Sequence, residues 1–434
     1  MKISVMGTGY VGLVTGATLS EAGNDIVCLD IVEDKINQLN KGESPIFEPG
    51  LDKLIKKGIA KGNLKGSTNI EQGIVESDIT FICVGTPSKK DGSIDLNYIK
   101  NASSAIGRAL RHKQDVHTII VKSTVIPQTT ENVVLPIISK KSGRKRENIG
   151  IGMNPEFLRE GSAVKDALKP DRIVIGHADE VALNVLKEIY KDHDCPKLEC
   201  NPRTAEFIKY ASNAFLATKI SFANEMANMC SIWGIDFKEV AEGMGMDSRI
   251  SPQFLQAGAG FGGSCFPKDV KALAAAAKSD KIGSKILTAT LEVNESQPKI
   301  VIGMTKERLG VLKGKKIAIL GLTFKPETDD VRESRTEIVV KELVDEGAKV
   351  IGHDPEGIEN FKKIIDIETS NTLNEVVKGA DCLILMTEWK EYLEMDLKSL
   401  KERMNGNVII DGRRALNPEK VKEAGFDYKS IGLG

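Results

Sequence analysis

The residues best suited to covalent chemistry lie in a glycine-rich segment that leads to Cys265. Four of the six residues from Gly258 to Gly263 are glycine, which gives a backbone that can approach a ligand closely. Lys268 and Asp269 follow the cysteine closely along the chain. A nearby cation and a helix N-terminus favour the reactive thiolate, and a nearby carboxylate can act as a general base. The segment therefore predicts a covalent nucleophile.

A second glycine-rich segment, Gly7 to Gly12, has the spacing of a dinucleotide-binding turn. It follows a short apolar run and opens a stretch with helical periodicity, which is the context that such a turn requires. Gly7 would allow the tight turn, Gly9 the approach of a pyrophosphate, and Gly12 close packing of helix on strand. Asp30 ends the next apolar run, where an acid can bind ribose hydroxyls and repel a 2′-phosphate. The pattern predicts NAD rather than NADP.

Two further apolar runs end in small or hydroxyl residues. Thr86 follows the first of these runs and Thr124 follows the second. Because ligands of open α/β sheets bind at the carboxyl ends of strands, both threonines are candidate ligand contacts. A structural turn explains Thr86 equally well.

The elements around these residues alternate between apolar runs and helix-like stretches. The runs are rich in Val and Ile, which is typical of βαβ units with a buried parallel sheet. We expect strands at Lys2 to Met6, Asp25 to Leu29, Ile79 to Val84, Thr118 to Val121 and Arg172 to Ile175.

The pattern changes near residue 200. No Gly or Pro interrupts the run from Ala205 to Trp233, and Gly234 then provides a helix stop. This run predicts one long helix that could connect domains or form a dimer core. An α/β pattern returns from Lys313 onwards. Its expected strands are Lys316 to Leu320, Lys349 to Ile351, Cys382 to Met386 and Val408 to Ile410.

The expected fold is therefore α/β, with two Rossmann-like domains joined by a helical domain that contains one long central helix. We expect an NAD-binding Rossmann domain at residues 1–200, a central helical domain with the cysteine loop at 201–312, and a C-terminal α/β domain at 313–434. Gly321 follows the first strand of the last domain without a GxGxxG pattern. A second dinucleotide site is therefore not expected there.

Composition excludes several classes of protein. The 434 residues carry a formal net charge of -1, which argues against a nucleic-acid partner. No apolar run reaches the roughly 18 residues of a membrane helix, and the first residues lack the zones of a signal peptide. Seven cysteines without a CxxC pair argue against a disulfide framework or a metal site, and favour a reducing cytoplasm. We expect four of them to be buried structural thiols: Cys28, Cys83, Cys230 and Cys382.

Seven segments together resemble the UDP-glucose/GDP-mannose dehydrogenase family over essentially the whole chain. In order along the chain they are MGTGYVGLVTG, CVGTP, KSTV, NPEFLREG, EFIKYASNAFLATKISFANE, GAGFGGSCFPKD and GLTFKPETDDVRESR. Several such segments in one order are highly specific. The resemblance implies that a nucleotide sugar is oxidised from a C6 alcohol to a carboxylate with two NAD. UDP-glucose is the first candidate for this substrate. Cys265 would carry a thiohemiacetal and then a thioester.

The resemblance also implies roles for individual residues. The catalytic set would comprise Cys265, Lys209, Asn213, Asp269, Glu156, Glu160 and Thr124. The cofactor would contact Gly7, Gly9, Tyr10, Val11, Gly12, Asp30, Lys35, Thr86, Thr124, Glu160, Lys268 and Arg335. The nucleotide sugar would contact Glu156, Phe157, Leu158, Lys209, Asn213, Phe254, Gly262, Lys325 and Arg413, with Arg249 donated across a homodimer interface. The C-terminal domain would bind UDP.

Three alternatives remain open from the sequence. A sister enzyme acting on GDP-mannose or a UDP-N-acetylhexosamine is the nearest, although the residues after Cys265 favour a hexose. A non-catalytic nucleotide-sugar sensor would have no need of Cys265, Lys209, Asn213 and Asp269 together. A 3-hydroxyacid or 6-phosphogluconate-type dehydrogenase shares the Rossmann-plus-long-helix plan, but it performs one hydride transfer and needs no thiol.

Overall fold

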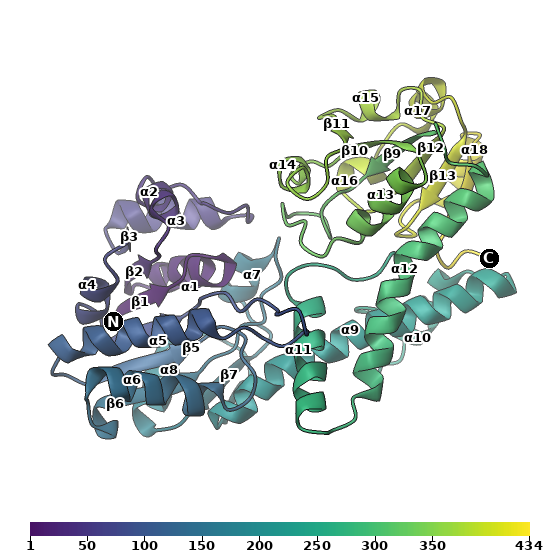
Figure 1. Cartoon of the computed structure of the whole chain (residues 1–434). Coiled ribbons are helices and arrows are strands. Elements are labelled where there is room, and N and C mark those ends of the chain that lie inside the picture. Colours follow the sequence, from purple (N-terminus) through teal and green to yellow (C-terminus); the bar gives the residue numbers. More distant parts are fainter. The chain divides into compact units, whose positions relative to one another are not determined.

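A computed structural model describes residues 1–434, which form two compact units, Met1–Ser212 and Asn213–Gly434 (Figure 1). We call them unit 1 and unit 2 and describe each by itself. Each unit contains one predominantly or wholly parallel sheet, as the alternating sequence pattern predicts.

Unit 1 is built on an eight-stranded sheet in the order β3-β2-β1-β4-β5-β6-β7-β8. Its neighbouring strands run parallel, except that β6 and β7 are antiparallel. The strands are β1 Lys2–Met6, β2 Asp25–Leu29, β3 Leu64–Ser67, β4 Ile79–Ile82, β5 His117–Val121, β6 Ile149–Met153, β7 Ile173–His177 and β8 Lys197–Cys200.

Helices cover both faces of this sheet. One buried cluster contains side chains of α1, α3, α7 and α8, and a second contains side chains of α4, α5 and α6. The helices are α1 Tyr10–Glu21, α2 Glu33–Asn40, α3 Leu51–Lys61, α4 Ile70–Val75, α5 Asn97–Ala109, α6 Leu135–Ser142, α7 Ala163–Leu168 and α8 Glu180–Ile189. Two apolar faces explain why the strands read as continuous hydrophobic runs.

The long helix expected after residue 200 is present as α9, Pro202–Trp233, which runs from unit 1 into unit 2. Pro202 occupies its first helical position, where the missing N–H costs nothing. Gly234 follows with a φ of 72°, a conformation that glycine adopts without strain. The helix therefore begins and ends at residues whose types favour those positions.

The first part of unit 2 is helical. It contains α10 Phe237–Gly245, α11 Phe266–Ser279 and α12 Lys285–Leu309, with the glycine-rich segment just before α11. Packing of α9, α11 and α12 buries a small cluster around Phe261 and Val270.

Unit 2 then forms a six-stranded parallel sheet in the order β11-β10-β9-β12-β13-β14. The strands are β9 Lys316–Leu320, β10 Lys349–His353, β11 Glu368–Thr369, β12 Cys382–Leu385, β13 Val408–Asp411 and β14 Asp427–Ser430. Ile317 and Ile319 face a cluster with α12, α13 and α14, whereas Ala318 and Leu320 face a cluster with α15 to α18. These helices are α13 Arg335–Asp345, α14 Ile358–Phe361, α15 Leu373–Val377, α16 Lys390–Leu393, α17 Leu397–Arg403 and α18 Pro418–Glu423.

Several strands were not expected from the sequence. The edge strands β3 and β8 are short and carry charged residues, and they lack the apolar runs that mark buried strands. The central strand β6 alternates isoleucine with glycine because its neighbours leave no room for a side chain. A Cβ at Gly150 would lie 2.9 Å from Thr118 Oγ1, and one at Gly152 would lie 2.8 Å from the Gly176 carbonyl oxygen.

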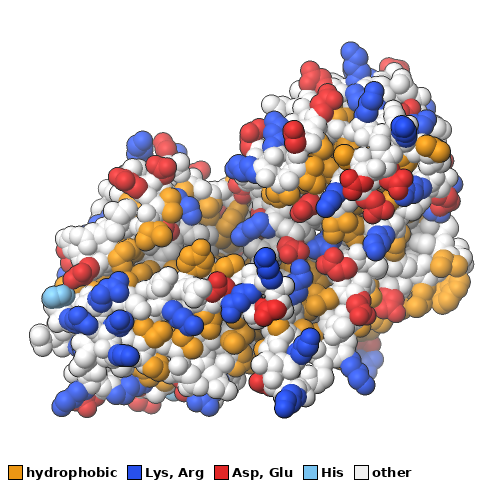
Figure 2. Space-filling model, in the orientation of Figure 1, with side chains coloured by type: hydrophobic (Ala, Val, Ile, Leu, Met, Phe, Trp, Pro, Cys, Tyr) orange, Lys and Arg blue, Asp and Glu red, His pale blue; other side chains and the backbone are white.

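The distribution of charged side chains on the surface agrees with the nearly neutral net charge of the sequence. Acidic and basic side chains are interspersed over the face drawn in Figure 2. None of the seven cysteines forms a disulfide. None of the helices combines the length and the apolar character that crossing a bilayer requires.

Candidate active site

The turn between β1 and α1 has the geometry expected of a dinucleotide cradle. Gly7 has a φ of 101°, and a Cβ there would lie 2.8 Å from the Cys83 carbonyl oxygen. A Cβ at Gly12 would lie 1.8 Å from the Gly7 carbonyl oxygen, so only glycine allows the helix to pack this closely. A Cβ at Gly9 would meet no atom within 4 Å, and no side chain caps α1. The helix N-terminus is therefore open to a pyrophosphate.

Asp30 lies beside this turn. Its Oδ2 accepts hydrogen bonds from the Thr8 amide at 2.8 Å and the Thr8 hydroxyl at 2.6 Å, and its Oδ1 accepts one from the Val32 amide at 3.1 Å. Partial burial acts to raise the pKa of this carboxyl, but the hydrogen bonds and Lys35 lower it overall. Asp30 thus stays ionised at neutral pH and only half-buried, as an acceptor for ribose hydroxyls requires.

Four other predicted cofactor residues lie in unit 1 around this end of the sheet. Tyr10 begins α1 and donates a hydrogen bond from its hydroxyl to the Phe47 carbonyl at 3.1 Å. Thr86 is buried in the turn after β4, and Thr124 is half-buried after β5. Lys35 lies on α2, two helical positions after Glu33. The two strand ends are tied together because the Ser123 hydroxyl donates to the Val84 carbonyl at 2.7 Å.

A buried ion pair links the loop after β6 to helix α9. Lys209 Nζ lies 2.8 Å from Glu156 Oε1, with side chains 3% and 6% exposed. Burial opposes ionisation of Glu156, but Lys209 and the Leu158 amide hold its pKa below the usual range. The Glu156 carboxylate therefore stays ionised. Glu160 is half-buried four residues further along the same non-helical loop.

Two cations lie close to the Phe157 ring. The Arg172 guanidinium carbon is 3.8 Å from its ring centroid, and Lys209 Nζ is 5.5 Å from that centroid. Leu158 packs partly buried against the core that contains α1. The loop from Glu156 to Leu158 is therefore held by contacts with Arg172, Lys209 and this core.

Sequence reasoning missed two buried ionisable groups of unit 1. Lys122, directly after β5, donates from Nζ to Asn154 Oδ1 at 2.8 Å, and its charge helps to lower the pKa of Glu156. Glu206 on α9 accepts from the Thr130 amide and hydroxyl at 2.8 and 2.6 Å. Burial raises the pKa of Glu206 to about 7. The sequence offered one signal for each of these groups: Lys122 is a charged residue in a strand-end motif, and Glu206 is a charged residue in a long helix.

The cysteine of unit 2 lies at the N-cap of α11, a helix of 14 residues. Cys265 is half-buried, and its Sγ lies 3.5 Å from the Ser264 hydroxyl oxygen. The partial positive charge of a helix N-terminus favours a thiolate at this position.

A polar trio joins the first turn of the same helix to α9. Asn213 on α9 donates from Nδ2 to Asp269 Oδ2 at 2.7 Å, and Lys268 pairs with the other carboxylate oxygen. Asp269 is 1% exposed, and Asn213 is 6% exposed. The trio therefore brings a buried carboxylate, an amide and an ammonium together at the first turn of the helix that Cys265 caps.

Two asparagines that the candidate set does not include hold the glycine-rich segment. Asn224 on α9 accepts from the Gly258 amide at 2.7 Å. Asn294 on α12 accepts from the Phe261 amide at 2.7 Å and donates to the Phe261 carbonyl at 3.0 Å. Both asparagines are buried. Two polar residues inside long helices thus fix the backbone that leads to Cys265.

The predicted substrate residues of the unit 2 sheet lie beside this segment. A Cβ at Gly262 would lie 2.3 Å from the Glu333 carbonyl oxygen, and one at Gly263 would lie 2.7 Å from the Phe324 ring. Lys325 Nζ lies 5.4 Å from the Phe324 ring centroid. Arg413 donates from its guanidinium to the Phe324 carbonyl at 2.7 Å. The loops after β9 and β13 therefore meet at Phe324.

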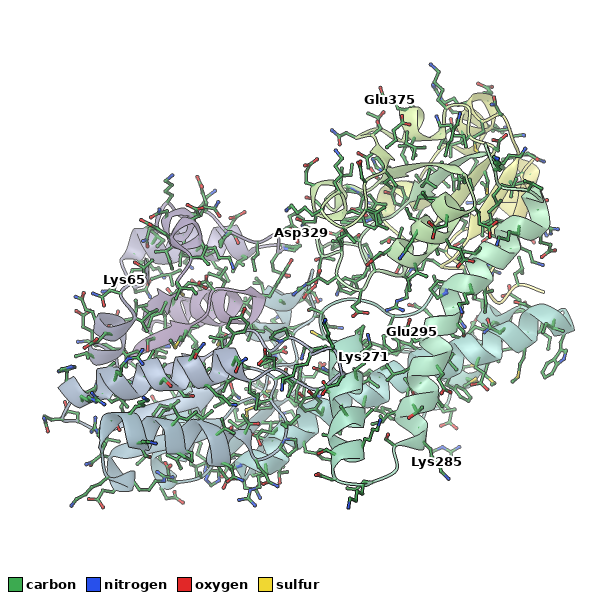
Figure 3. All side chains as sticks on the ribbon, in the orientation of Figure 1. Lys65, Lys271, Lys285, Glu295, Asp329 and Glu375 are labelled. Atoms are coloured by element: carbon green, nitrogen blue, oxygen red, sulfur yellow. The ribbon has the colours of Figure 1, made fainter.

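Arg335 is buried and takes part in a series of connected ion pairs. It is 5% exposed and pairs with Glu295 at 3.2 Å and Glu333 at 3.3 Å. Glu333 also pairs with Lys271 at 3.3 Å. Lys271 on α11 and Glu295 on α12 are labelled in Figure 3. A contact of Arg335 with the cofactor stays a prediction.

Two other predicted substrate residues follow α10. Arg249 is exposed and pairs with Asp247 at 2.6 Å, so its donation to a partner also stays a prediction. The Phe254 and Phe266 ring centroids are 6.2 Å apart, in an edge-to-face arrangement next to the cysteine loop.

The structure thus gathers the candidate residues into separate groups within each unit. Unit 1 holds the NAD cradle and the Glu156–Lys209 pair, and unit 2 holds Cys265 with its polar trio. Lys209 and Asn213 lie one turn apart on the continuous helix α9. No group of three or more His, Cys, Asp or Glu side chains could hold a metal ion.

Comparison with known proteins agrees with this geometry. Residues 1–194 match the NAD binding domain of the UDP-glucose/GDP-mannose dehydrogenase family, 203–296 match its central domain, and 318–418 match its UDP binding domain. The UDP-glucose 6-dehydrogenase YwqF of Bacillus subtilis is 42% identical over 434 residues, covering 100% of this chain and 98% of that protein.

Two solved structures are similar over the whole chain. A UDP-glucose dehydrogenase from Pyrobaculum islandicum has a TM-score of 0.94 and 40% identity, covering 100% of this chain and 98% of that one. A UDP-D-ManNAc dehydrogenase from Pyrococcus horikoshii has a TM-score of 0.88 and 28% identity, covering 100% of each chain. The chain therefore belongs to the UDP-glucose/GDP-mannose dehydrogenase family of NAD-dependent oxidoreductases.

Proposed function

We propose that this enzyme oxidises C6 of UDP-glucose to give UDP-glucuronate, with two NAD⁺ consumed per sugar. Relatives named for UDP-glucose match at 42% and 40% identity, against 28% for the relative named for UDP-D-ManNAc. In the balanced reaction, the alcohol, water and two NAD⁺ give the carboxylic acid, two NADH and two protons. NAD⁺ supplies the hydride acceptor when it is bound at the turn after β1.

Cys265 would act as the nucleophile between the two oxidations. Its thiolate adds to the C6 aldehyde, forming a carbon–sulfur bond while the carbonyl oxygen takes up a proton. Loss of the second hydride, which NAD⁺ would accept, and of the hydroxyl proton converts this thiohemiacetal to a thioester. Water then breaks the carbon–sulfur bond, releasing the acid and regenerating the thiol. The position of Cys265 at the N-cap of α11 supports this role.

The remaining catalytic roles follow the family resemblance. Lys209 and Asn213 would polarise the C6 oxygen and stabilise the oxyanions, which their burial one turn apart on α9 supports. Asp269 would serve as a base beside the thiol. Glu156 would assist hydrolysis of the thioester, and its ionised state supports a proton-accepting role. Glu160 and Thr124 would order the attacking water.

The single observation that carries the proposal is the arrangement around Cys265. A thiol at a helix N-terminus, a buried Asn213–Asp269–Lys268 trio and a glycine segment clamped by two helices occur together in unit 2. A dehydrogenase that transfers one hydride needs no thiol. A binding protein without catalysis would not require a thiol beside a buried carboxylate.

Counting the NADH formed from each sugar tests the reaction directly. We expect two NADH for each UDP-glucose consumed, with little product from GDP-mannose or UDP-N-acetylhexosamines. One NADH per sugar would contradict the thioester route, and no NADH would favour a sensor. A stronger rate with GDP-mannose would move the substrate to that branch of the family.

We also propose a cytoplasmic homodimer that forms through α9. Phe215 and Phe222 are 66% and 46% exposed and lie seven residues apart, which places them on one face of the helix. Charging both positions with aspartate should convert the dimer to a monomer in sedimentation experiments. Tyr98→Asp changes a similarly exposed aromatic residue on α5 and is the matched control. An unchanged sedimentation coefficient in the double variant would argue against this interface.

A further inference from the structure

Asp354, directly after β10, has no part in the chemistry proposed above, yet donors surround its carboxylate. Oδ2 accepts from the Leu322 amide at 2.7 Å, the Thr323 amide at 3.0 Å and the Thr323 hydroxyl at 2.9 Å. The Trp389 indole N–H approaches the same oxygen at 3.3 Å. Asp354 is only 2% exposed. Its Oδ2 atom is therefore hydrogen-bonded within the protein, and the buried side chain is closed to a ligand.

The other carboxylate oxygen is also occupied. Oδ1 accepts from the Glu356 amide at 3.0 Å and from the Gly357 amide at 2.8 Å. Each of these hydrogen-bonding neighbours of Asp354 is a donor. Only a carboxylate, which carries no N–H of its own in its ionised form, can accept from all of them. An amide at this position would turn an N–H group toward other N–H groups.

The counterpart of Asp354 in unit 1 is Asp30. In both sheets a positive-φ glycine follows the first strand, and its amide donates to the carbonyl of the last residue of the next strand. Gly7 donates to Leu29 at 2.8 Å, and Gly321 donates to His353 at 2.9 Å. The aspartate after each second strand then accepts from the residue after the glycine. Asp354 thus occupies the ribose-binding position of a dinucleotide fold without being accessible to a ribose.

The turn that Asp354 holds leads to the predicted substrate residues. The Thr387 hydroxyl donates to the Thr323 carbonyl at 2.6 Å, and Arg413 donates to the Phe324 carbonyl at 2.7 Å. The Phe324 ring packs against Gly263, two residues before the nucleophile. A shift of the turn would therefore move Phe324, Arg413 and the cysteine loop together.

We propose that Asp354 is a positioning residue for the nucleotide sugar, because its carboxylate fixes the Gly321 to Phe324 turn and so places Phe324, Lys325 and Arg413. The inference rests on the proposed function, since it takes Lys325 and Arg413 to contact the UDP-sugar. Asp354 does not touch the substrate. It transmits its effect through the Leu322 and Thr323 backbone.

The test compares Asp354→Asn and Thr323→Val in the full-length enzyme. Affinity for UDP is measured by calorimetry without NAD, and KM is measured separately for UDP-glucose and NAD. We expect Asp354→Asn to weaken UDP binding about tenfold or more, since two donors would then face each other. Thr323→Val removes one hydroxyl donor at nearly constant volume and should weaken UDP binding severalfold. The KM for NAD should stay within about twofold in both variants.

Thr305→Val is the matched control, because it removes an equally buried hydroxyl from α12, away from the turn. It should leave UDP affinity unchanged. Should Asp354→Asn fail to fold, as judged by circular dichroism, Thr323→Val decides alone. Wild-type UDP affinity in folded Thr323→Val, or an equal loss in Thr305→Val, overturns the inference. Failure of the wild-type enzyme to bind UDP would instead overturn the proposed function on which it rests.

Discussion

The two sheets share the glycine turn after their first strand, but the segment beyond that turn is different. In unit 1, α1 begins at Tyr10, immediately beyond the glycine turn, and its N-terminus is open. In unit 2, α13 begins only at Arg335, and the chain from Leu322 to Ser334 intervenes. The inserted segment carries Phe324 and Lys325 and packs on the glycine-rich loop before Cys265.

The difference shows how one backbone plan can serve two purposes. A helix N-terminus directly after the glycine leaves amides free for a pyrophosphate. In unit 2 a loop stands at the same place, and its Leu322 and Thr323 amides donate hydrogen bonds to Asp354. These amides are not free to bind an anion. The loop instead carries side chains that reach the cysteine loop. The family's names for the two regions, NAD binding and UDP binding, agree with this division.

The largest effects are expected when a Cβ is added to a glycine in either of the two turns. Gly12→Ala would place a Cβ 1.8 Å from the Gly7 carbonyl oxygen, and Gly321→Ala would place one 2.4 Å from Thr387 Cβ at a φ of 98°. Each should cost about 3 kcal/mol or more in the free energy of unfolding, the upper end for overpacked sites. Calorimetry with limited proteolysis should show the loss in unit 1 for Gly12→Ala and in unit 2 for Gly321→Ala.

Gly9→Ala is the matched control for the first turn, because the added Cβ meets nothing within 4 Å. It should keep the stability of unit 1 within about 1 kcal/mol while raising the KM for NAD. Equal destabilisation by Gly9→Ala and Gly12→Ala would contradict the different roles assigned to these glycines.

A smaller effect, confined to the cofactor, is expected from Asp30→Asn. Asp30 is ionised, half-buried and hydrogen-bonded to Thr8, so a ribose hydroxyl can reach its remaining acceptor positions. Loss of a hydrogen bond to a charged group is worth about 1.5–3 kcal/mol, which predicts a KM for NAD about 10- to 100-fold higher. UDP affinity should not change. A change in UDP affinity alone would reverse the comparison with Asp354.

The last expected effect concerns pH and belongs to unit 1 only. Burial raises the pKa of Glu206 to about 7, from an ordinary value of 4.5, with Glu131 adding repulsion and Arg203 pairing with Glu131 at 2.7 Å. A raised pKa stabilises the fold at low pH, and this contribution is lost as the pH rises toward 7. Relative to Glu206→Gln, the wild type should lose up to about 3 kcal/mol between pH values of roughly 4.5 and 7.5. Urea unfolding at successive pH values measures this, and parallel curves would refute it.

Local sequence signals predicted one class of features well. Gly7 and Gly12 were predictable because the turn needs particular residue types at fixed spacing, and α9 because nothing interrupts it between Pro202 and Gly234. Cys265 stood out in the sequence because its glycine-rich approach makes no sense as core, and its role as the nucleophile stays a prediction. The nearly uniform Val and Ile of the buried strands likewise predicted both sheets.

Other features depended on contacts between distant residues. The bonds from Asn294 to Phe261 and from Asp354 to Thr323 join residues 33 and 31 positions apart, and no local pattern marks them. Strand β6 was missed because its glycines reflect the neighbouring strands rather than its own propensity. Glu206 looks like an ordinary surface acid on a helix until its burial is known.

Replacing Cys265, the proposed nucleophile, tests the central claim most directly. Cys265→Ser should retain the fold and NAD binding but lose nearly all NADH formation from UDP-glucose, since a serine hydroxyl is a far weaker nucleophile at neutral pH. Cys195→Ser, which changes another half-buried thiol, is the control and should keep wild-type turnover. Two NADH per sugar at an undiminished rate from Cys265→Ser would contradict the covalent route.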